Sequence, residues 1–142
     1  MMSQTLLPAA RLRRILLVDD EVNQITILKA GLAKLPDCEV ATATGGRQAL
    51  GLLAQQTFDL VITDYHMPEM DGLALAAAVH QQYPLLHIIM LTAFSYELLR
   101  AQAGDSPVRL VLQKPIDINQ IRAVVLQALE HAAVPDDQER KS

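Results

Sequence analysis

The sequence predicts an α/β domain with a doubly wound, five-stranded parallel sheet and helices on both faces. Short apolar runs, of the kind found in strands buried on both sides, alternate with segments whose apolar residues recur at helical spacing. The strand starts lie roughly 20 to 27 residues apart, which is typical of successive βαβ units. Hydrophobic residues make up 51% of the chain and aromatic residues 4%. This composition suits helices that pack on such a sheet.

The first half of the chain supplies three of the strands. Residues 1–13 lack periodicity and are expected to form a flexible leader. Apolar residues from Ile25 to Leu35 recur at helical spacing until Pro36 ends the helix. The next strand is more polar, which suits the edge of a sheet. The expected elements are a strand at 14–18, a helix at 22–35, a strand at 39–43, a helix from Gly45-Gly46 to about residue 56 and a strand at 59–63.

The second half continues the alternation. Asp71-Gly72 starts a helix that ends before Pro84, and Asp117 with Gln120 resembles a capping box at the start of the last helix. The expected elements are a helix at 71–82, a strand at 86–91, a short helix at 95–103, a strand at 108–112 and a helix at 117–132. A disordered polar tail is expected at 133–142. Residues 14–132 then form one domain.

Charge and composition exclude several classes of function. The 12 basic and 16 acidic residues give a net charge of -4, which lacks the basic footprint of a nucleic-acid-binding protein. The single cysteine, Cys38, excludes an internal disulfide and suits a reducing cytoplasm. No apolar run reaches the length of about 18 residues that a membrane span needs, and the N-terminus has no secretory signal pattern. We therefore expect a cytoplasmic protein without membrane or direct nucleic-acid contact.

Chemically matched residues follow or end four of the strands, namely Asp19-Asp20, Asp64, Thr92 and Lys114. In a parallel sheet the carboxyl ends of the strands share one edge, where ligands bind. Two carboxylates about 4 Å apart repel by roughly 4 kcal/mol at an effective dielectric constant near 20. The three carboxylates therefore favour a bound cation, and their oxygen atoms suit Mg²⁺. The alternative, in which each Asp caps a helix or pairs with Lys114, explains the residues singly but not their shared position.

A carboxylate beside Mg²⁺ is also a nucleophile that can form an aspartyl phosphate. Phosphoryl transfer mostly requires positioning and neutralisation of the phosphoryl oxygens. Mg²⁺, the ammonium of Lys114 and the hydroxyl of Thr92 supply these, so Asp64, Thr92 and Lys114 are the candidate catalytic residues. The sequence contains no Gly-x-x-x-x-Gly-Lys loop for ATP. The phosphoryl group is therefore expected from a donor that brings its own leaving group.

Four stretches around these strand ends form a recognisable set, namely residues 15–21 (ILLVDDE), 64–72 (DYHMPEMDG), 91–93 (LTA) and 114–115 (KP). Together they resemble the receiver domain of two-component response regulators. The resemblance covers about residues 14–132 and implies a flavodoxin-like strand order, 2-1-3-4-5. It also implies that Asp64 is phosphorylated by a sensor histidine kinase or a phosphotransfer protein.

The resemblance implies roles for the other residues at the strand ends. Asp20 would ligate Mg²⁺ directly and Asp19 mainly through water, while His66 would add its backbone carbonyl as a ligand. Thr92 would be the switch hydroxyl that moves toward the phosphoryl group. Lys114 would form a salt bridge to that group.

One position departs from the family pattern. Family members often carry an aromatic residue three positions before the lysine, where it turns inward on activation, but this chain has Val111. Phe94 and Tyr96 are candidates for a substitute read-out. The resemblance also implies a cis peptide bond between Lys114 and Pro115.

The leading hypothesis is a phosphorylation-controlled switch and not an enzyme that turns over a substrate. Its partner-binding surface would comprise the helix at 95–103, the strand at 108–112 and the last helix. That surface would bind a downstream protein, an output domain or a second copy of the chain. Two alternatives stay open, namely a phosphorylation-independent interaction module and an N-terminal receiver fragment of a longer regulator.

Two other α/β classes are disfavoured. A metal-dependent phosphatase needs a second Asp two residues after its nucleophile, where this chain has His66. A flavin-binding module would need a phosphate-cradling loop after the first strand, and Asp19 and Asp20 would repel that phosphate.

Overall fold

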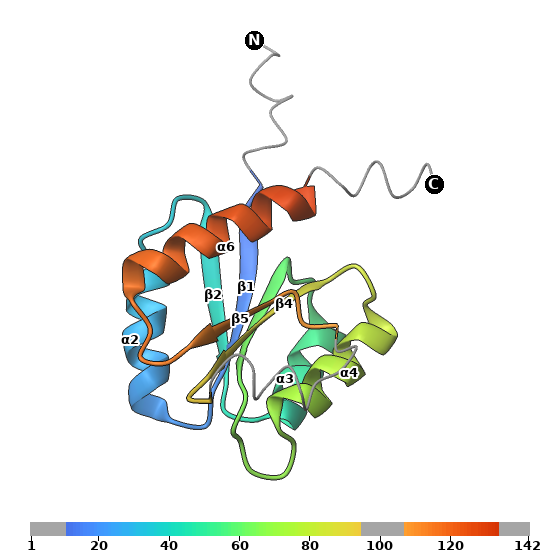
Figure 1. The fold of residues 1–142 in the computed structure, drawn as a ribbon. Coiled ribbons are helices and arrows are strands. Elements are labelled where there is room, and N and C mark those ends of the chain that lie inside the picture. The colour runs from blue at the N-terminus through green and yellow to red at the C-terminus, as the bar shows by residue number, and fades with distance from the viewer. Residues whose placement is uncertain (1–10, 95–106, 134–142) are drawn as a thin grey trace.

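The computed structural model describes residues 11–94 and 107–133. They form a five-stranded sheet in which all neighbouring strands are parallel, in the order β2-β1-β3-β4-β5 (Figure 1). The strands are β1 (Arg13–Val18), β2 (Cys38–Ala43), β3 (Leu60–Asp64), β4 (His87–Thr92) and β5 (Leu110–Gln113). The helices are α2 (Val22–Leu32), α3 (Gly46–Gln55), α4 (Gly72–Gln82) and α6 (Ile118–Ala133). The predicted fold class and strand order are confirmed, and the polar second strand lies at an edge of the sheet.

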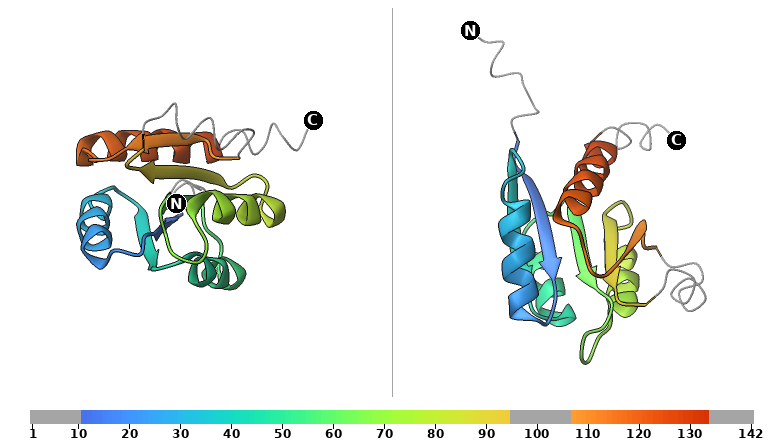
Figure 2. Two further views of the ribbon diagram at one scale, coloured as in Figure 1. Left: turned by 60° about the horizontal axis from the view of Figure 1, so that its bottom comes forward. Right: turned by 60° about the vertical axis from the view of Figure 1, so that its left-hand side comes forward.

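Helices cover both faces of the sheet (Figure 2). Side chains of α2 and α6 pack on one face, whereas side chains of α3 and α4 pack on the other. β1 supplies both clusters: Ile15 and Leu17 belong to the first, and Leu16 and Val18 to the second. This division follows from the strand geometry, because successive side chains point to opposite faces. Among the helices that the structure describes, none is long and apolar enough to cross a membrane.

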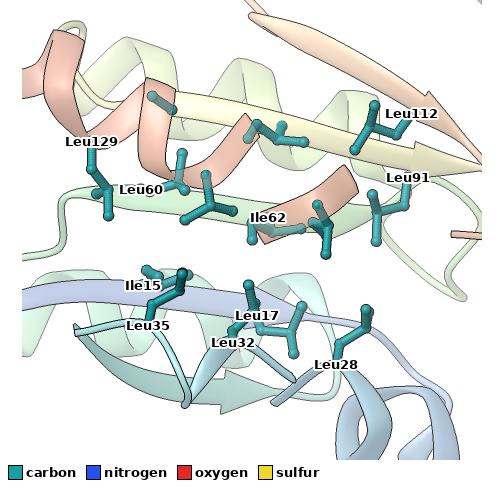
Figure 3. Close-up of a cluster of buried hydrophobic side chains, with 14 of the residues drawn as sticks. Ile15, Leu17, Leu28, Leu32, Leu35, Leu60, Ile62, Leu91, Leu112 and Leu129 are labelled. Carbon is teal, nitrogen blue, oxygen red and sulfur yellow. The ribbon is translucent and has the colours of Figure 1, made fainter. Parts of the chain in front are cut away.

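Burial of the central strands holds their carboxyl ends in place. Figure 3 shows the cluster on the α2 and α6 face, where side chains from β1, β3, β4 and β5 gather between the sheet and the two helices. All five residues of β3 are buried. Each large apolar side chain contributes about 1.5–3 kcal/mol when it is fully buried. A displacement of β3 along its axis would therefore cost several such contributions.

Some element boundaries differ from the predicted ones. α2 ends at Leu32 and not at residue 35, because beyond the cap residue Ala33 the amides of Lys34 and Leu35 bond to carbonyls three residues back in a turn. β3 and β4 each extend one residue further than predicted, so that Asp64 and Thr92 are the last strand residues. β5 begins at Leu110 and not at residue 108. The predicted helix at 95–103 lies outside the described residues, as do residues 1–10 and 134–142.

Asp59 ties the start of β1 to the segment that precedes β3. Its Oδ2 atom accepts a hydrogen bond from the backbone amide of Arg14 at 2.8 Å, and its own amide donates to the carbonyl of Arg14 at 2.8 Å. Its Oδ1 atom lies 2.9 Å from Nη2 of Arg11. The side chain of Asp59 is 11% exposed, whereas that of Arg11 is 57% exposed. The backbone contact should therefore contribute more stability than the ion pair.

Replacing Asp59 and Arg11 in turn tests whether the backbone contact contributes more stability than the ion pair. Asp59→Ala is expected to lower the free energy of unfolding by about 1–3 kcal/mol, because it leaves a partly buried amide without its acceptor. Arg11→Ala should cost no more than about 1 kcal/mol, because it removes only an exposed ion pair. Urea unfolding of both variants beside the unmodified chain measures the two losses. Equal losses would contradict the assignment.

Candidate functional site

The candidate site lies at the carboxyl edge of the sheet. Asp64 is the last residue of β3 and pairs in register with Leu91, while Thr92 ends β4 and pairs with Gln113. Asp19 follows β1, and Lys114 follows β5. Because all strands are parallel, these four positions come together at one edge.

Three carboxylates form the acidic cluster of the site. Asp19, Asp20 and Asp64 each place one carboxylate oxygen so that the three oxygens lie within 4.8 Å of one another. Asp19 is 1% exposed and Asp64 is 6% exposed, whereas Asp20 faces the solvent. The cluster therefore has a buried floor and one exposed member.

Asp19 is only half satisfied by hydrogen bonds. Its Oδ1 atom accepts a bond from the amide of Glu21 at 2.9 Å. Its Oδ2 atom is buried and has no hydrogen-bond partner within the described part of the chain. Leaving a charged acceptor buried without a partner costs free energy. A divalent cation with oxygen ligands would satisfy this atom, so the residues present fit the Mg²⁺ that the sequence predicts.

The electrostatics of the cluster are unbalanced. Nζ of Lys114 lies 2.8 Å from Oδ1 of Asp64, and both side chains are largely buried. Burial raises the pKa of Asp19, and the charges of Asp64 and Asp20 raise it further, while the Glu21 amide and Lys114 act in the opposite direction. One ammonium faces three carboxylates. The metal-free site thus holds Asp19 in a place that disfavours its ionised form.

The loop at 65–71 is anchored at both ends beside Asp64. At the start, the amide of Tyr65 donates to the carbonyl of Leu91 at 2.8 Å. At the end, the side chain of Asp71 accepts from the amide of Ala74 at 2.8 Å and caps α4. The amide of Gly72 donates to the carbonyl of Tyr65 at 2.8 Å.

Gly72 permits a close approach of helix and strand. A Cβ atom at this position would lie only 2.6 Å from the carbonyl oxygen of Asp64 and 2.9 Å from Cα of Tyr65. No side chain fits there without a shift of the backbone. The first residue of α4 therefore packs directly against the backbone of the candidate acceptor.

Thr92 connects the site to its neighbours. Its buried hydroxyl accepts a hydrogen bond from the amide of Phe94 at 3.0 Å, and its carbonyl accepts from the amide of Lys114 at 2.7 Å. The ring of Phe94 lies with its centroid 5.4 Å from that of Tyr65, at an angle of 57°. These contacts link the ends of β4 and β5 to the loop that follows Asp64.

The family model of the response regulator receiver domain matches residues 15–126. The chain belongs to this family. Over 117 residues it is 37% identical to the transcriptional regulatory protein ZraR of Escherichia coli K12, which covers 82% of this chain and 26% of ZraR. Over 114 residues it is 34% identical to the DNA-binding transcriptional regulator NtrC of Salmonella typhimurium, with 80% of this chain and 24% of NtrC covered. The receiver domain thus spans about a quarter of the length of these relatives.

Solved structures agree with this assignment. The signal receiver domain of an HD domain-containing protein from Pseudomonas fluorescens Pf-5 superposes with a TM-score of 0.79 at 36% identity, covering 87% of this chain and 98% of that one. NtrX from Brucella abortus, solved in complex with ATP, superposes with a TM-score of 0.80 at 25% identity, covering 89% of this chain and 29% of NtrX.

The receiver domain brings most of the sequence-predicted site residues together. Asp19, Asp20, Asp64 and Lys114 meet at short distances, and Thr92 joins them through the backbone. The side chain of His66 is exposed to solvent. The Lys114-Pro115 peptide bond is cis, as predicted.

The sequence alone left open how Val111 packs and whether Phe94 or Tyr96 contacts the site. Val111 is half-buried and packs against the cluster on the α3 and α4 face. Phe94 contacts Tyr65, whereas Tyr96 lies outside the described residues. The close approach of Gly72 was missed, because the Asp71-Gly72 pair signalled only the start of a helix.

Replacing Asp19 should stabilise the metal-free receiver domain at neutral pH. A raised pKa means that the folded state binds the proton more tightly than the unfolded chain does. This contribution to stability is complete below the unfolded pKa and is lost as the pH rises through the folded pKa. Asp19→Asn cannot ionise, so in the absence of divalent cations it should raise the melting temperature near pH 7.5.

The expected gain is about 3 °C, the shift that about 1 kcal/mol produces in a domain of this size. It should shrink as the pH is lowered from 7.5 toward 4, because protonation of Asp19, whose pKa is raised, removes the buried charge that asparagine also lacks. Thermal unfolding in EDTA across this pH range measures it. A gain that is the same at every pH, or a loss at neutral pH, would contradict the electrostatic reading.

Proposed function

We propose that this receiver domain is a phosphorylation-dependent signalling switch. In this proposal Asp64 accepts a phosphoryl group from a sensor histidine kinase or a phosphotransfer protein in a reaction that needs Mg²⁺. The observation that supports it is the environment of Asp64: a buried carboxylate 2.8 Å from a lysine ammonium and within 4.8 Å of two further carboxylates. Such a grouping suits a carboxylate nucleophile. The lysine offsets the repulsion between the acidic cluster and the negatively charged phosphoryl group.

The side chains have distinct roles in the proposed reaction. An oxygen of Asp64 attacks the phosphorus atom, and the bond between phosphorus and the donor's leaving group breaks as the new P–O bond forms. Asp19, Asp20 and Asp64 would hold the cation together with the backbone carbonyl of His66. When bound, Mg²⁺ supplies counter-charge to the phosphoryl oxygens.

Lys114 would exchange its contact with Asp64 for a contact with the phosphoryl group. The ammonium already lies 2.8 Å from the acceptor carboxylate, so a small movement reaches an oxygen attached to it. Thr92 would donate its hydroxyl hydrogen to another phosphoryl oxygen. Beside a bound cation, these two groups would stabilise the negative charge on the equatorial oxygens in the transition state.

The same contacts give the switch its read-out. Movement of Thr92 toward the phosphoryl group would change its bond with the Phe94 amide, and movement of Lys114 would act on β5. Coupling of this kind is typically worth about 1–3 kcal/mol. We propose that it alters a partner-binding surface that includes β5, α6 and the helix predicted at 95–103.

The partners and context belong to the proposal as well. The surface would bind a downstream protein or an output domain, and a homodimer through the same face is the third option. Direct nucleic-acid contact, membrane contact and substrate turnover are not part of the proposed function, and the proposed location is the cytoplasm. Residues 14–132 would be the receiver domain, with 1–13 as leader and 133–142 as tail.

Incubation with acetyl phosphate and Mg²⁺, followed by intact-mass measurement, tests the proposal. The unmodified chain should gain one phosphoryl group, because acetyl phosphate brings its own leaving group. Asp64→Asn should gain none. Asp71→Asn is the matched control: it alters a carboxylate in the same loop that lies outside the acidic cluster, and Asn preserves the helix cap.

The metal is tested in the same experiment. EDTA in place of Mg²⁺ should abolish the adduct in the unmodified chain. An adduct that persists in Asp64→Asn, or one that forms equally in EDTA, would contradict the proposal. A folded chain that binds Mg²⁺ but takes no phosphoryl group, even from a histidine kinase panel, would favour a phosphorylation-independent interaction module.

A further inference from the structure

The path of the loop at 65–71 depends on a contact outside the acidic cluster. The loop leaves the sheet at Tyr65 and re-enters regular structure at Asp71. Between these two anchors Glu69 adopts a left-handed backbone conformation, with φ of 70°, and the amide of Met70 donates to the carbonyl of Pro68 at 2.7 Å. The turn therefore fixes the direction in which Cβ of Met70 leaves the backbone.

Met70 packs against the first residue of α3. That residue, Gly46, is buried. A Cβ atom on Gly46 would overlap Sδ of Met70 and would lie 2.9 Å from its Cγ and 3.1 Å from its Cβ. Glycine is required here for space, because only its lack of a side chain lets Met70 lie over the start of α3.

The consequences of filling this space would reach the loop backbone. Rotation of the Met70 side chain can move Sδ and Cγ, but Cβ is attached to the backbone and, at 3.1 Å from the added atom, can give way only if the backbone shifts. The neighbouring turn leaves few alternative conformations. A side chain at position 46 would therefore displace the segment that includes His66, which carries the proposed carbonyl ligand.

We propose that Gly46 is a positioning residue for the cation site. It touches neither the acidic cluster nor the acceptor, and it acts through Met70 on the loop that passes them. This inference rests on the proposed function insofar as that function places the His66 carbonyl at the cation.

Gly46→Ala tests the inference, and Gly51→Ala in the same helix is its matched control. Gly51 is exposed, and a Cβ atom there would have nothing within 4 Å. Both substitutions place alanine in α3, and alanine has the higher helix propensity in a helix interior. The measurement is the Mg²⁺ concentration at half-saturation, taken from the rise in melting temperature of the full chain with added Mg²⁺. The rate of adduct formation from acetyl phosphate is recorded beside it.

Gly46→Ala should raise the Mg²⁺ half-saturation about tenfold, the lower end of the effects seen when partners that orient metal ligands are removed. Gly51→Ala should leave it unchanged. Adding Met70→Ala to Gly46→Ala removes the overlapping side chain and should return the half-saturation to within about twofold of that of Met70→Ala alone. A purely structural role would lower the melting temperature without changing the Mg²⁺ half-saturation.

Two results would overturn the proposal: the same half-saturation in Gly46→Ala and Gly51→Ala, or a defect in Gly46→Ala that Met70→Ala does not relieve. If Gly46→Ala does not fold, the double variant carries the test. It must fold and bind Mg²⁺ like Met70→Ala, and its failure to fold beside a folded Met70→Ala would count against the proposal. Failure of the proposed function gives a different result. The unmodified chain would then bind Mg²⁺ without taking a phosphoryl group, and the Mg²⁺ half-saturation of the variants could still be compared.

Discussion

The burial of Asp19 is the constraint on which the rest of the site depends. The four residues before it, Ile15 to Val18, are all buried at 0% exposure in the middle of the sheet. Each contributes about 1.5–3 kcal/mol, and their sum exceeds the repulsion of roughly 4 kcal/mol between two carboxylates about 4 Å apart. The core therefore holds Asp19 beside Asp64 although its second oxygen has no partner within the described residues. Oδ2 of Asp19 can gain a partner from a bound cation or a proton. A rearrangement of the neighbouring side chains is the third way to supply one.

The ion pair of Lys114 and Asp64 makes such a rearrangement accessible. A buried ion pair is weak evidence for stability, because the cost of desolvation offsets most of the attraction. Here it places the ammonium of Lys114 against a carboxylate that the buried strand β3 holds in position. A new charge on Asp64 would redirect the ammonium, and the backbone bond from Lys114 to Thr92 would carry that movement to β4 and β5. The acidic cluster and the read-out are thus parts of one arrangement.

Much of this arrangement could be predicted from the sequence. Continuous apolar runs indicated parallel strands, and a parallel sheet brings Asp64, Thr92 and Lys114 to one edge whatever the details of packing. Contacts between elements that are distant in the chain could not be predicted. The space that Gly46 leaves for Met70 and the approach of Gly72 to Asp64 depend on how helices sit against strands, and a glycine pair in sequence signals only a turn or a helix start. The predicted end of α2 was wrong for a similar reason. Leu35 keeps the helical spacing of apolar residues and is buried, but it lies in the turn after the helix and not in the helix itself.

The most direct measurement locates the phosphoryl group on the chain. Reduction with borohydride converts an aspartyl phosphate to homoserine, so digestion and peptide mass analysis after phosphorylation identify the modified residue. The account predicts modification at Asp64 alone, since among the carboxylates that the structure describes only this one forms an ion pair with Lys114. Modification at Asp19 or Asp20 would contradict it, because the account assigns the acceptor role to the carboxylate that pairs with Lys114 and gives these two neighbours a role in holding the cation alone.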